Sequence, residues 1–237
     1  MLIKTKAIVL SALRYQEKSL IVKCFTESDG LKSYYVRDAF TSKKSSQKTV
    51  YFRPLNILEI EATHKNKGSL EYFKEVRFAH PYFSISTDIT KTTIAIFISE
   101  ILHHCIKEEE KNQSLYSFLE TALLWLDSND DAANFHLILL LEISKFLGFY
   151  PNSSSNAFPF FEMTEGVFVP YASVSCLSAE ESSLLRRLMA LKFDSSIKAF
   201  HVIERQQLLK VLVDYYAFHL DGFKRPKSLE VLREVFS

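Results

Sequence analysis

Hydrophobic and polar side chains alternate along the first 80 residues with the two-residue period of half-buried β-strands. The alternation predicts strands over residues 7–13, 20–25, 31–36, 50–61 and 70–76. Turn-forming residues separate them, such as Ser28-Asp29-Gly30 after the second strand and Gly68 before the fifth. Short strands linked in this way can form a small closed barrel, because closure removes the exposed edges of the sheet.

After Pro81 the hydrophobic period becomes helical. Apolar residues at intervals of three and four predict helices over 94–105 and 115–125. A third helix over 132–147 is apolar on nearly every side, so we expect it at the centre of a bundle, ended by Gly148. Ser178 and Glu181 have the spacing of a capping box, and further helices are expected over 178–191, 197–220 and 228–236.

These elements predict an α+β protein in which a five-stranded β-barrel of the oligonucleotide/oligosaccharide-binding (OB) fold precedes an all-α helical domain. We expect the OB-fold domain over residues 1–80 and the helical domain over 81–237, with an irregular loop or hairpin insertion at about 151–175. The chain has 237 residues, of which 47% are hydrophobic, and can therefore bury a substantial core.

Composition and motifs exclude several classes of protein. No apolar stretch approaches the ~20 residues of a membrane-spanning helix, and no signal peptide opens the chain, so we expect a soluble, cytoplasmic protein. The five glycines are too widely spaced for a phosphate-binding loop, and no hydrolase motif is present. His103-His104-Cys105 would diverge around a helix, and Glu108-Glu109-Glu110 is expected to be a solvated helix end. We expect neither catalysis nor a bound metal.

The formal net charge of +1 conceals an asymmetry between the two parts of the chain. Residues 1–80 contain 15 Lys and Arg against 8 Asp and Glu, whereas residues 81–237 contain 14 against 20. Basic side chains that neutralise phosphates release counterions and gain affinity for a polyanion. The asymmetry therefore favours a nucleic-acid partner for the first part, although lysines can also serve only to keep a small β domain soluble.

Cations and aromatic rings are interleaved between Gly30 and Arg53. Single-stranded nucleic acid is bound by such a combination, because cations follow the backbone while rings stack on bases. Alternation requires one of Tyr34 and Tyr35 to point into the barrel. The predicted DNA-binding residues are Lys32, Tyr34, Arg37, Lys43, Lys44, Lys48 and Arg53. The alternative is a protein-interaction adaptor with an OB fold that does not bind nucleic acid directly.

Three further stretches follow one another along nearly the whole chain. They are 5–10 with 15–30 and Val36-Arg37, then 141–151 (LEISKFLGFYP), and finally Tyr215-Tyr216 with His219-Leu220, Lys227-Ser228 and Leu232. In this order they resemble the RecO family of bacterial DNA repair and recombination mediators.

The resemblance implies a mediator rather than an enzyme. It implies binding of single- and double-stranded DNA, annealing of complementary strands, and loading of the recombinase RecA together with RecR. It also implies contact with the acidic C-terminal tail of single-stranded DNA-binding protein, and a cytoplasmic, nucleoid-associated location. The cations that could hold such a tail in the helical domain are Lys145, Arg186, Arg187 and Arg205.

Two stretches depart from the family pattern. Many members carry a four-cysteine zinc loop after the LGFxP-like turn, but residues 152–170 contain no cysteine, so we expect no cofactor and no zinc. This loop would instead be held by packing of Phe158, Phe160, Phe161 and Phe168. Asp38-Ala39-Phe40 replaces a frequent Gly-Ala-Arg, which removes a permissive glycine and a cation that Lys43 and Lys44 are close enough to replace.

Overall fold

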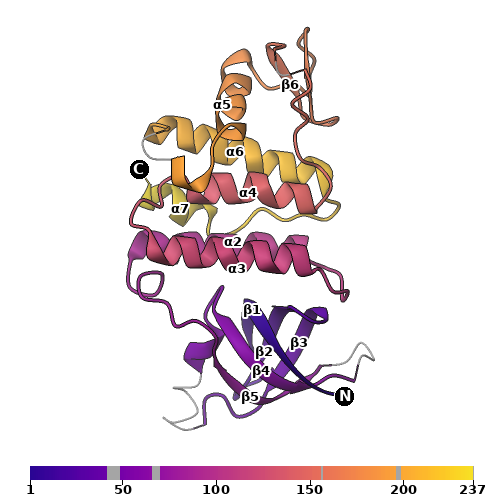
Figure 1. Cartoon of the computed structure of the whole chain (residues 1–237), viewed down its shortest axis with the longest axis vertical. Coiled ribbons are helices and arrows are strands. Elements are labelled where there is room, and N and C mark those ends of the chain that lie inside the picture. Colours follow the sequence, from indigo (N-terminus) through magenta and orange to yellow (C-terminus); the bar gives the residue numbers. More distant parts are fainter. Residues whose placement is uncertain (42–48, 66–69, 156, 196–198, 237) are drawn as a thin grey trace. The chain divides into compact units, whose positions relative to one another are not determined.

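The alternating N-terminal segment forms a 5-stranded antiparallel sheet in a computed structural model of the chain (Figure 1). The strands lie in the order β3-β2-β1-β4-β5. Their bounds are β1 Leu2–Tyr15, β2 Ser19–Thr26, β3 Gly30–Val36, β4 Ile57–Thr63 and β5 Tyr72–Phe78. Helices follow the sheet, which confirms the predicted α+β class with an N-terminal OB-type sheet and a helical remainder.

The structure describes residues 1–41, 49–65, 70–155, 157–195 and 199–236. The chain divides into two compact units, of which unit 1 is Met1–Ser128 with Pro226–Ser228 and unit 2 is Asn129–Arg225 with Leu229–Ser237. Unit 1 therefore includes the first two helices as well as the sheet. That residues 1–80 form a domain of their own stays a prediction.

The core of the sheet is formed by the apolar positions of the alternating pattern. Val22 and Cys24 of β2 are fully buried together with Leu58 and Ala62 of β4. Gly30 adopts a φ of 65° in the turn between β2 and β3, a conformation that glycine accepts without steric cost. The turn predicted at Ser28-Asp29-Gly30 is thereby confirmed.

The sheet is not closed into a continuous barrel. One parallel bridge joins β3 to the residue before β5, with Tyr35 N donating to Glu71 O at 2.9 Å and Glu71 N donating to Ser33 O at 2.8 Å. No strand ladder between β3 and β5 continues beyond this bridge in the described residues. The expectation of full closure was wrong, and the gap between the two strands, here called the seam, stays open.

The strand predicted over 50–61 is shorter than expected. Thr49–Phe52 form a single 3-10 turn, η1, and β4 begins only at Ile57. Pro54 has no N–H to donate to a ladder, and Leu55 has a left-handed φ of 60°. These two residues interrupt the extended backbone.

Two helices complete unit 1, α2 Ile89–Cys105 and α3 Gln113–Ser128. Both begin earlier than the apolar stripe alone predicts. Asp88 caps α2 by accepting a hydrogen bond from Lys91 N at 2.8 Å, which fixes the start of this helix. The ring of Tyr116 on α3 packs 5.8 Å from that of Phe25 on β2. Lys6 of β1 donates to the Glu120 carboxylate on α3 at 2.9 and 3.0 Å, so α3 is fixed to the sheet.

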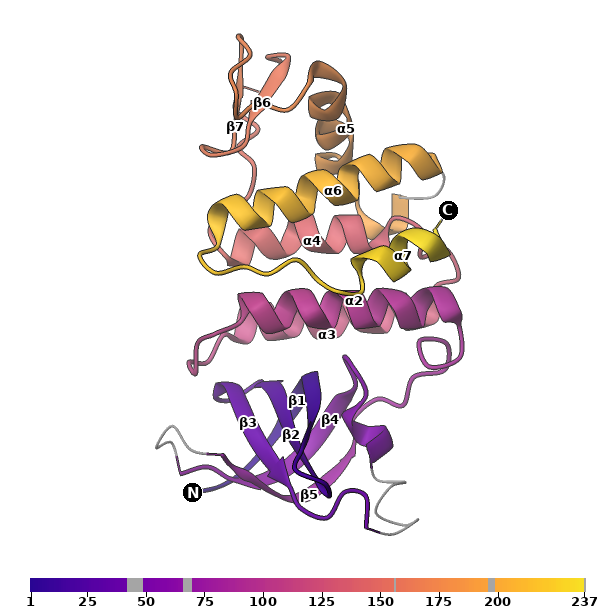
Figure 2. The ribbon, with the colours of Figure 1, turned by 180° about the vertical axis from the view of Figure 1, so that it is seen from behind.

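Unit 2 is built around α4 Phe135–Phe146, which is buried along most of its length as predicted. Gly148 follows the end of this helix with a φ of 84° and confirms the predicted helix stop. The elements that follow are the strands β6 Phe160–Glu162 and β7 Val167–Val169, α5 Ala179–Met189, the 3-10 turn η2 Phe193–Ser195, α6 Val202–His219 and α7 Leu229–Val235 (Figure 2). The capping box at Ser178 and Glu181 is confirmed. Every helix among the described residues is too short or too polar to cross a lipid bilayer.

Candidate nucleic-acid interface

The open seam of unit 1 forms a hollow of about 670 Å³ between β3 and β5, here called the seam hollow. Its aromatic lining comes from three elements that are distant in sequence. Tyr35 belongs to β3, Tyr51 to η1, and Tyr72 to β5. The remaining lining residues are Val36, Arg37, Phe52, Phe73, Lys74, Glu75 and Val76.

Three tyrosines form a row along this side of the sheet, here called the tyrosine row. The ring of Tyr35 lies 6.2 Å from that of Tyr15 and 6.0 Å from that of Tyr72, with interplanar angles of 83° and 74°. Tyr72 is 45% exposed and Tyr15 is 43% exposed. The Tyr35 hydroxyl lies 2.8 Å from Ser19 Oγ, which fixes the central ring.

A second hollow, of about 470 Å³, adjoins the first. Both hollows include Tyr35 and Arg37 in their linings, so the two lie on either side of these side chains. The second is also lined by Gln16, Glu17, Lys18, Ser19 and Asp38. The two neighbouring hollows are together called the path here.

Arg37 lines this path, Arg53 follows the lining residue Phe52 in sequence, and Lys65 lies near the lining residue Tyr72. Arg37 and Arg53 are exposed, and neither forms an ion pair with any described residue. The ammonium of Lys65 lies 5.9 Å from the centroid of the Tyr72 ring. By contrast, Lys74 and Arg77 on β5 pair with carboxylates of β4, those of Glu61 and Glu59. The path therefore combines aromatic faces with cations that are free to meet an anion.

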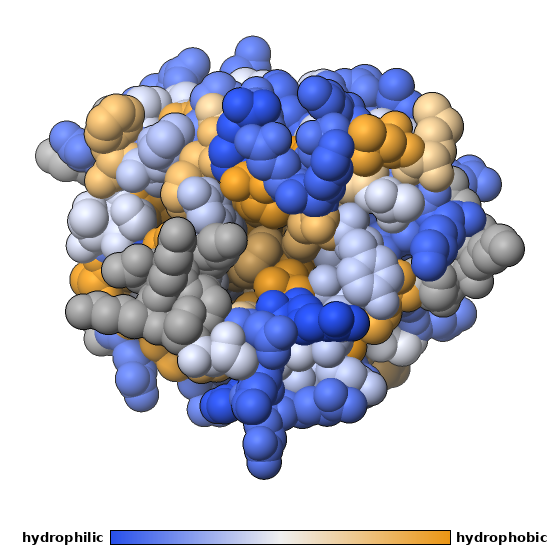
Figure 3. Space-filling model, turned by 90° about the horizontal axis from the view of Figure 1, so that it is seen from below, coloured by the Kyte–Doolittle hydropathy of each residue, from blue (hydrophilic) through white to orange (hydrophobic). Residues whose placement is uncertain are grey.

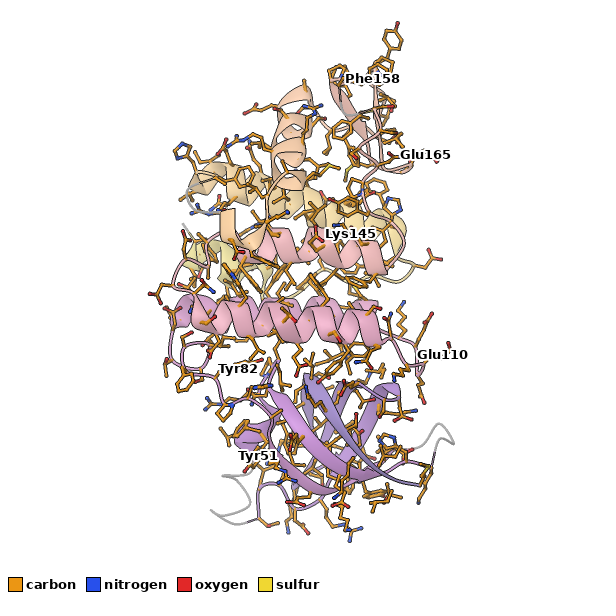
Figure 4. The ribbon with its side chains drawn as sticks, viewed as in Figure 1. Tyr51, Tyr82, Glu110, Lys145, Phe158 and Glu165 are labelled. Carbon is orange, nitrogen blue, oxygen red and sulfur yellow. The ribbon has the colours of Figure 1, made fainter. Side chains whose placement is uncertain are left out.

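The surface of this region has the same organisation. Viewed from below, the molecule has a central recess with hydrophobic residues in it, and hydrophilic residues lie above and below this recess (Figure 3). Tyr51 lies at the η1 side of the sheet (Figure 4), with its ring 4.6 Å from that of Phe78. An apolar recess with a polar rim can hold flat bases while their phosphates remain at the edge.

Two of the predicted DNA-binding residues point into the sheet rather than outward. Tyr34 is fully buried, and its ring stacks on Phe73 at 4.1 Å. Lys32 is 5% exposed and pairs with Glu109 at 2.8 Å. Because alternate residues of a strand share a face, Lys32 and Tyr34 face the interior while Tyr35 and Arg37 face the path. The assignment of Lys32 and Tyr34 to an outward surface was wrong.

The other predicted cations are placed only in part. Arg37 and Arg53 are both exposed, and Arg37 lines both hollows of the path. Lys43, Lys44 and Lys48 lie outside the described residues.

Tyr34 belongs to a buried polar group that supports the seam. Its hydroxyl lies 2.8 Å from His64 Nε2, and Asp29 Oδ2 lies 3.4 Å from His64 Nδ1. Burial raises the pKa of Tyr34 far above its usual value. Burial also lowers the pKa of His64, although the carboxylates of Asp29 and Glu71 oppose this effect. Both side chains are therefore neutral near pH 7, which suits a structural hydrogen bond rather than acid–base chemistry.

Asp38-Ala39-Phe40, which replaces the family's frequent Gly-Ala-Arg, has a distinctive backbone and a neighbouring cation. Asp38 adopts a φ of 53°, in the left-handed region where glycine is favoured and aspartate is tolerated. The guanidinium of Arg14 on β1 lies 4.9 Å from the centroid of the Phe40 ring. A cation from another strand thus stands beside the position where the family pattern has arginine.

The four cations predicted to bind a partner all belong to unit 2, where each already has a contact. Lys145 pairs with Glu142 at 2.6 Å, and Arg187 pairs with Glu204 at 2.6 Å. Arg186 donates to Phe158 O, and Arg205 donates to Phe200 O. A hollow of about 470 Å³ in the same unit has a different lining, in which the apolar side chains of Met163, Val174, Leu177, Val211 and Phe218 accompany Lys210 and Arg225.

Sequence reasoning missed Tyr15, Tyr72 and Lys65 as members of the interface. Tyr15 and Tyr72 stand at the ends of their strands, where the alternating pattern is weakest. Strand alternation was the signal that could have identified Tyr35. Tyr34 is buried, and its neighbour Tyr35 therefore lies on the opposite face of the strand. The row itself depends on the bridge between β3 and β5, which no local pattern reveals.

The loop predicted to be held by phenylalanines forms the β6–β7 hairpin. Phe161 is fully buried, and its ring lies 5.1 Å from that of Phe168 and 5.6 Å from that of Tyr215. Phe158 was also expected to pack in this loop, but it is 41% exposed and lies outside this cluster. Within the part of the chain that the structure describes, no three His, Cys, Asp or Glu side chains are grouped to hold a metal ion.

Comparisons with known proteins agree along the whole chain. The model of the N-terminal part of recombination protein O matches residues 1–82, and that of the C-terminal part matches residues 86–230. The chain is 66% identical over 238 residues to the DNA repair protein RecO of Flavobacterium psychrophilum and 64% identical over 237 residues to that of Flavobacterium johnsoniae. It is 37% identical over 242 residues to that of Bacteroides fragilis. Each comparison covers 100% of both chains.

Proposed function

Since the chain belongs to the recombination protein O (RecO) family of DNA repair proteins, we propose that it binds DNA through unit 1 and anneals complementary strands. The observation that carries this proposal is the path across the tyrosine row. It combines aromatic rings with the cation Arg37, and the exposed Arg53 follows the lining residue Phe52 in sequence. Rings and cations together are the two components that bind a single strand without sequence preference.

Annealing requires charge neutralisation but no bond chemistry. Two strands repel one another through their phosphates, and cations along the path reduce this repulsion while a complementary strand approaches. The described residues offer no grouped metal ligands, and the buried Tyr34–His64 pair is held neutral. The proposed role is that of a mediator that pairs strands, which these cations and rings can support without any chemical step.

The mediator acts with other repair proteins in this proposal. It helps to load RecA together with RecR, and it binds the acidic C-terminal tail of single-stranded DNA-binding protein. The hollow of unit 2 is a candidate place for the last of these contacts, since apolar side chains line it together with Lys210. Its lining also includes Glu181 and the ion pair of Arg225 with Asp214, so Lys210 is the cation that an acidic tail would meet there.

Salt-titrated binding of a fluorescent single-stranded oligonucleotide tests the proposal. We expect log K to fall linearly with log salt, and Arg37→Ala and Arg53→Ala each to reduce the slope by about 0.7. Arg77→Ala is the matched control, because this exposed arginine of unit 1 pairs with Glu59 away from the path. Its slope should equal that of the unmodified chain.

The alternative is an adaptor that binds only proteins through its OB fold. Weak binding that is indifferent to salt, with no effect of Arg37→Ala, would favour the adaptor and overturn the proposal. An annealing assay with two complementary labelled strands completes the test. Annealing that is no faster with the protein than without it contradicts a role as an annealing mediator.

A further inference from the structure

We infer that the tyrosine row holds the bases of an unpaired strand and contributes little to the binding of a duplex, so that this site holds the annealed product more weakly than the single strand. The inference rests on the proposed function, since it assumes that nucleic acid lies along the path. It assigns the three rings of Tyr15, Tyr35 and Tyr72 the task of distinguishing the substrate of annealing from its product.

The spacing of the rings is the first argument. Adjacent ring centroids of the tyrosine row lie 6.2 and 6.0 Å apart. Successive bases along one strand of B-form DNA rise by only about 3.4 Å. A strand whose bases stack on one another cannot place neighbouring bases on neighbouring rings, whereas an extended strand with separated bases can.

The orientation of the rings is the second argument. The plane of Tyr35 is inclined by 83° to that of Tyr15 and by 74° to that of Tyr72. Bases stacked on these rings would lie nearly perpendicular to one another. Paired bases in a duplex are nearly parallel, so a duplex can use one ring at most and an unpaired strand can use all three.

Exposure and charge are the third argument. Tyr72 and Tyr15 are 45% and 43% exposed, and the ammonium of Lys65 lies 5.9 Å from the centroid of the Tyr72 ring. Tyr35 and Tyr72 line the seam hollow, and Tyr15 extends the row from Tyr35 beyond the lining. Arg37 lines both hollows, as does Tyr35. A phosphate between two splayed bases would therefore meet a cation at the centre of the row.

This arrangement favours release of the product over release of the substrate of annealing. While a strand is single, both the rings and the cations hold it. As base pairs form, the bases turn parallel and leave the rings, and only the contacts of phosphates with cations remain. The duplex then binds more weakly at this site than the strand from which it was formed.

The test compares a single-stranded oligonucleotide with a duplex of the same length, at one salt concentration. We expect Tyr72→Ala and Tyr15→Ala to weaken binding of the single strand about fivefold or more, and to change binding of the duplex by less than twofold. Tyr72→Phe keeps the ring and should retain the affinity. Tyr171→Ala, which removes a tyrosine of unit 2 that is 83% exposed, should change neither.

A second measurement reads the stacking directly. Trp125 is the single tryptophan, so Tyr72→Trp in a Trp125→Phe background places the only indole in the row. We expect the single strand to quench its fluorescence and the duplex to leave it almost unchanged. Thermal melting of each variant establishes that it is folded.

The outcomes separate this inference from the proposed function. Equal losses for single strand and duplex in Tyr72→Ala, or no loss for either, overturn the discrimination by the row. If Arg37→Ala still weakens both ligands, DNA binding by unit 1 stands while the inference fails. If neither Tyr72→Ala nor Arg37→Ala changes binding, both fail.

Discussion

The ammonium of Lys32 on β3 lies 2.8 Å from a carboxylate oxygen of Glu109, in the segment that connects α2 to α3. The Lys32 side chain is 6% exposed and that of Glu109 is 58% exposed. The backbone makes a parallel contact, in which Leu31 N donates to Glu108 O at 3.0 Å. The acidic run is thus exposed but tied to the sheet, and is not only a solvated helix end as expected.

The unequal burial of this pair predicts unequal costs of breaking it. Glu109→Gln leaves a buried ammonium without its counter-charge and should lower the free energy of unfolding by about 1–3 kcal/mol. Lys32→Met leaves only an exposed carboxylate and should cost less than about 1 kcal/mol. Urea unfolding of both variants provides the measurement. A larger cost for Lys32→Met would contradict this account of the pair.

Gly30 faces the same segment and tolerates no side chain. A Cβ at this position would meet Glu110 O and Glu110 N, the former at less than a carbon–oxygen contact distance, and the φ of 65° adds strain. We expect Gly30→Ala to destabilise unit 1 by about 2 kcal/mol or more. Gly148→Ala is the control, since nothing lies within 4 Å of its Cβ and only the φ of 84° matters. Equal costs for the two variants would show that contact with the acidic segment is unimportant.

The order of strands and helices could be predicted from the sequence because it depends on local periods. Alternation around Val22 and Cys24 located β2, and the uninterrupted apolar run of α4 correctly indicated a buried helix. The incomplete closure of the sheet, through a single bridge, could not be predicted in the same way. It depends on the pairing of Ser33 and Tyr35 with Glu71, residues far apart in sequence whose contact no periodicity specifies.

The candidate site shows the same division. Interleaved cations and rings predicted a binding region between Gly30 and Arg53, and Arg37 and Arg53 are exposed in it. That this region binds DNA stays a prediction. The choice of Tyr34 over Tyr35 failed because a register error of one residue exchanges the two faces of a strand. Tyr72 joins the row only through the bridge between β3 and β5, so its part could be seen only in the folded chain.

His136 on α4 should make unit 2 sensitive to acid. Burial, with a smaller contribution from the charge of Arg205, lowers the pKa of His136 from 6.5 to about 3. The unfolded chain therefore binds a proton below pH 6.5 that the folded chain refuses, and stability present above that pH is lost as the pH falls toward 3. His136→Gln should reduce the pH dependence of the free energy of unfolding by up to ~1.4 kcal/mol per pH unit within this range. Identical dependence in both chains, measured by urea unfolding at several pH values, would show that the folded chain accepts the proton.

The β6–β7 hairpin should depend on its aromatic packing and not on a metal. Phe161 is fully buried between Phe168 and Tyr215, and the Tyr215 hydroxyl donates to Phe149 O at 2.9 Å, which anchors the cluster to the end of α4. Phe161→Ala would leave a cavity and should lower the free energy of unfolding by about 3–5 kcal/mol. Treatment with EDTA should leave the melting temperature unchanged. If the chelator lowers the melting temperature while Phe161→Ala has little effect, a bound metal holds this hairpin and the aromatic account is wrong.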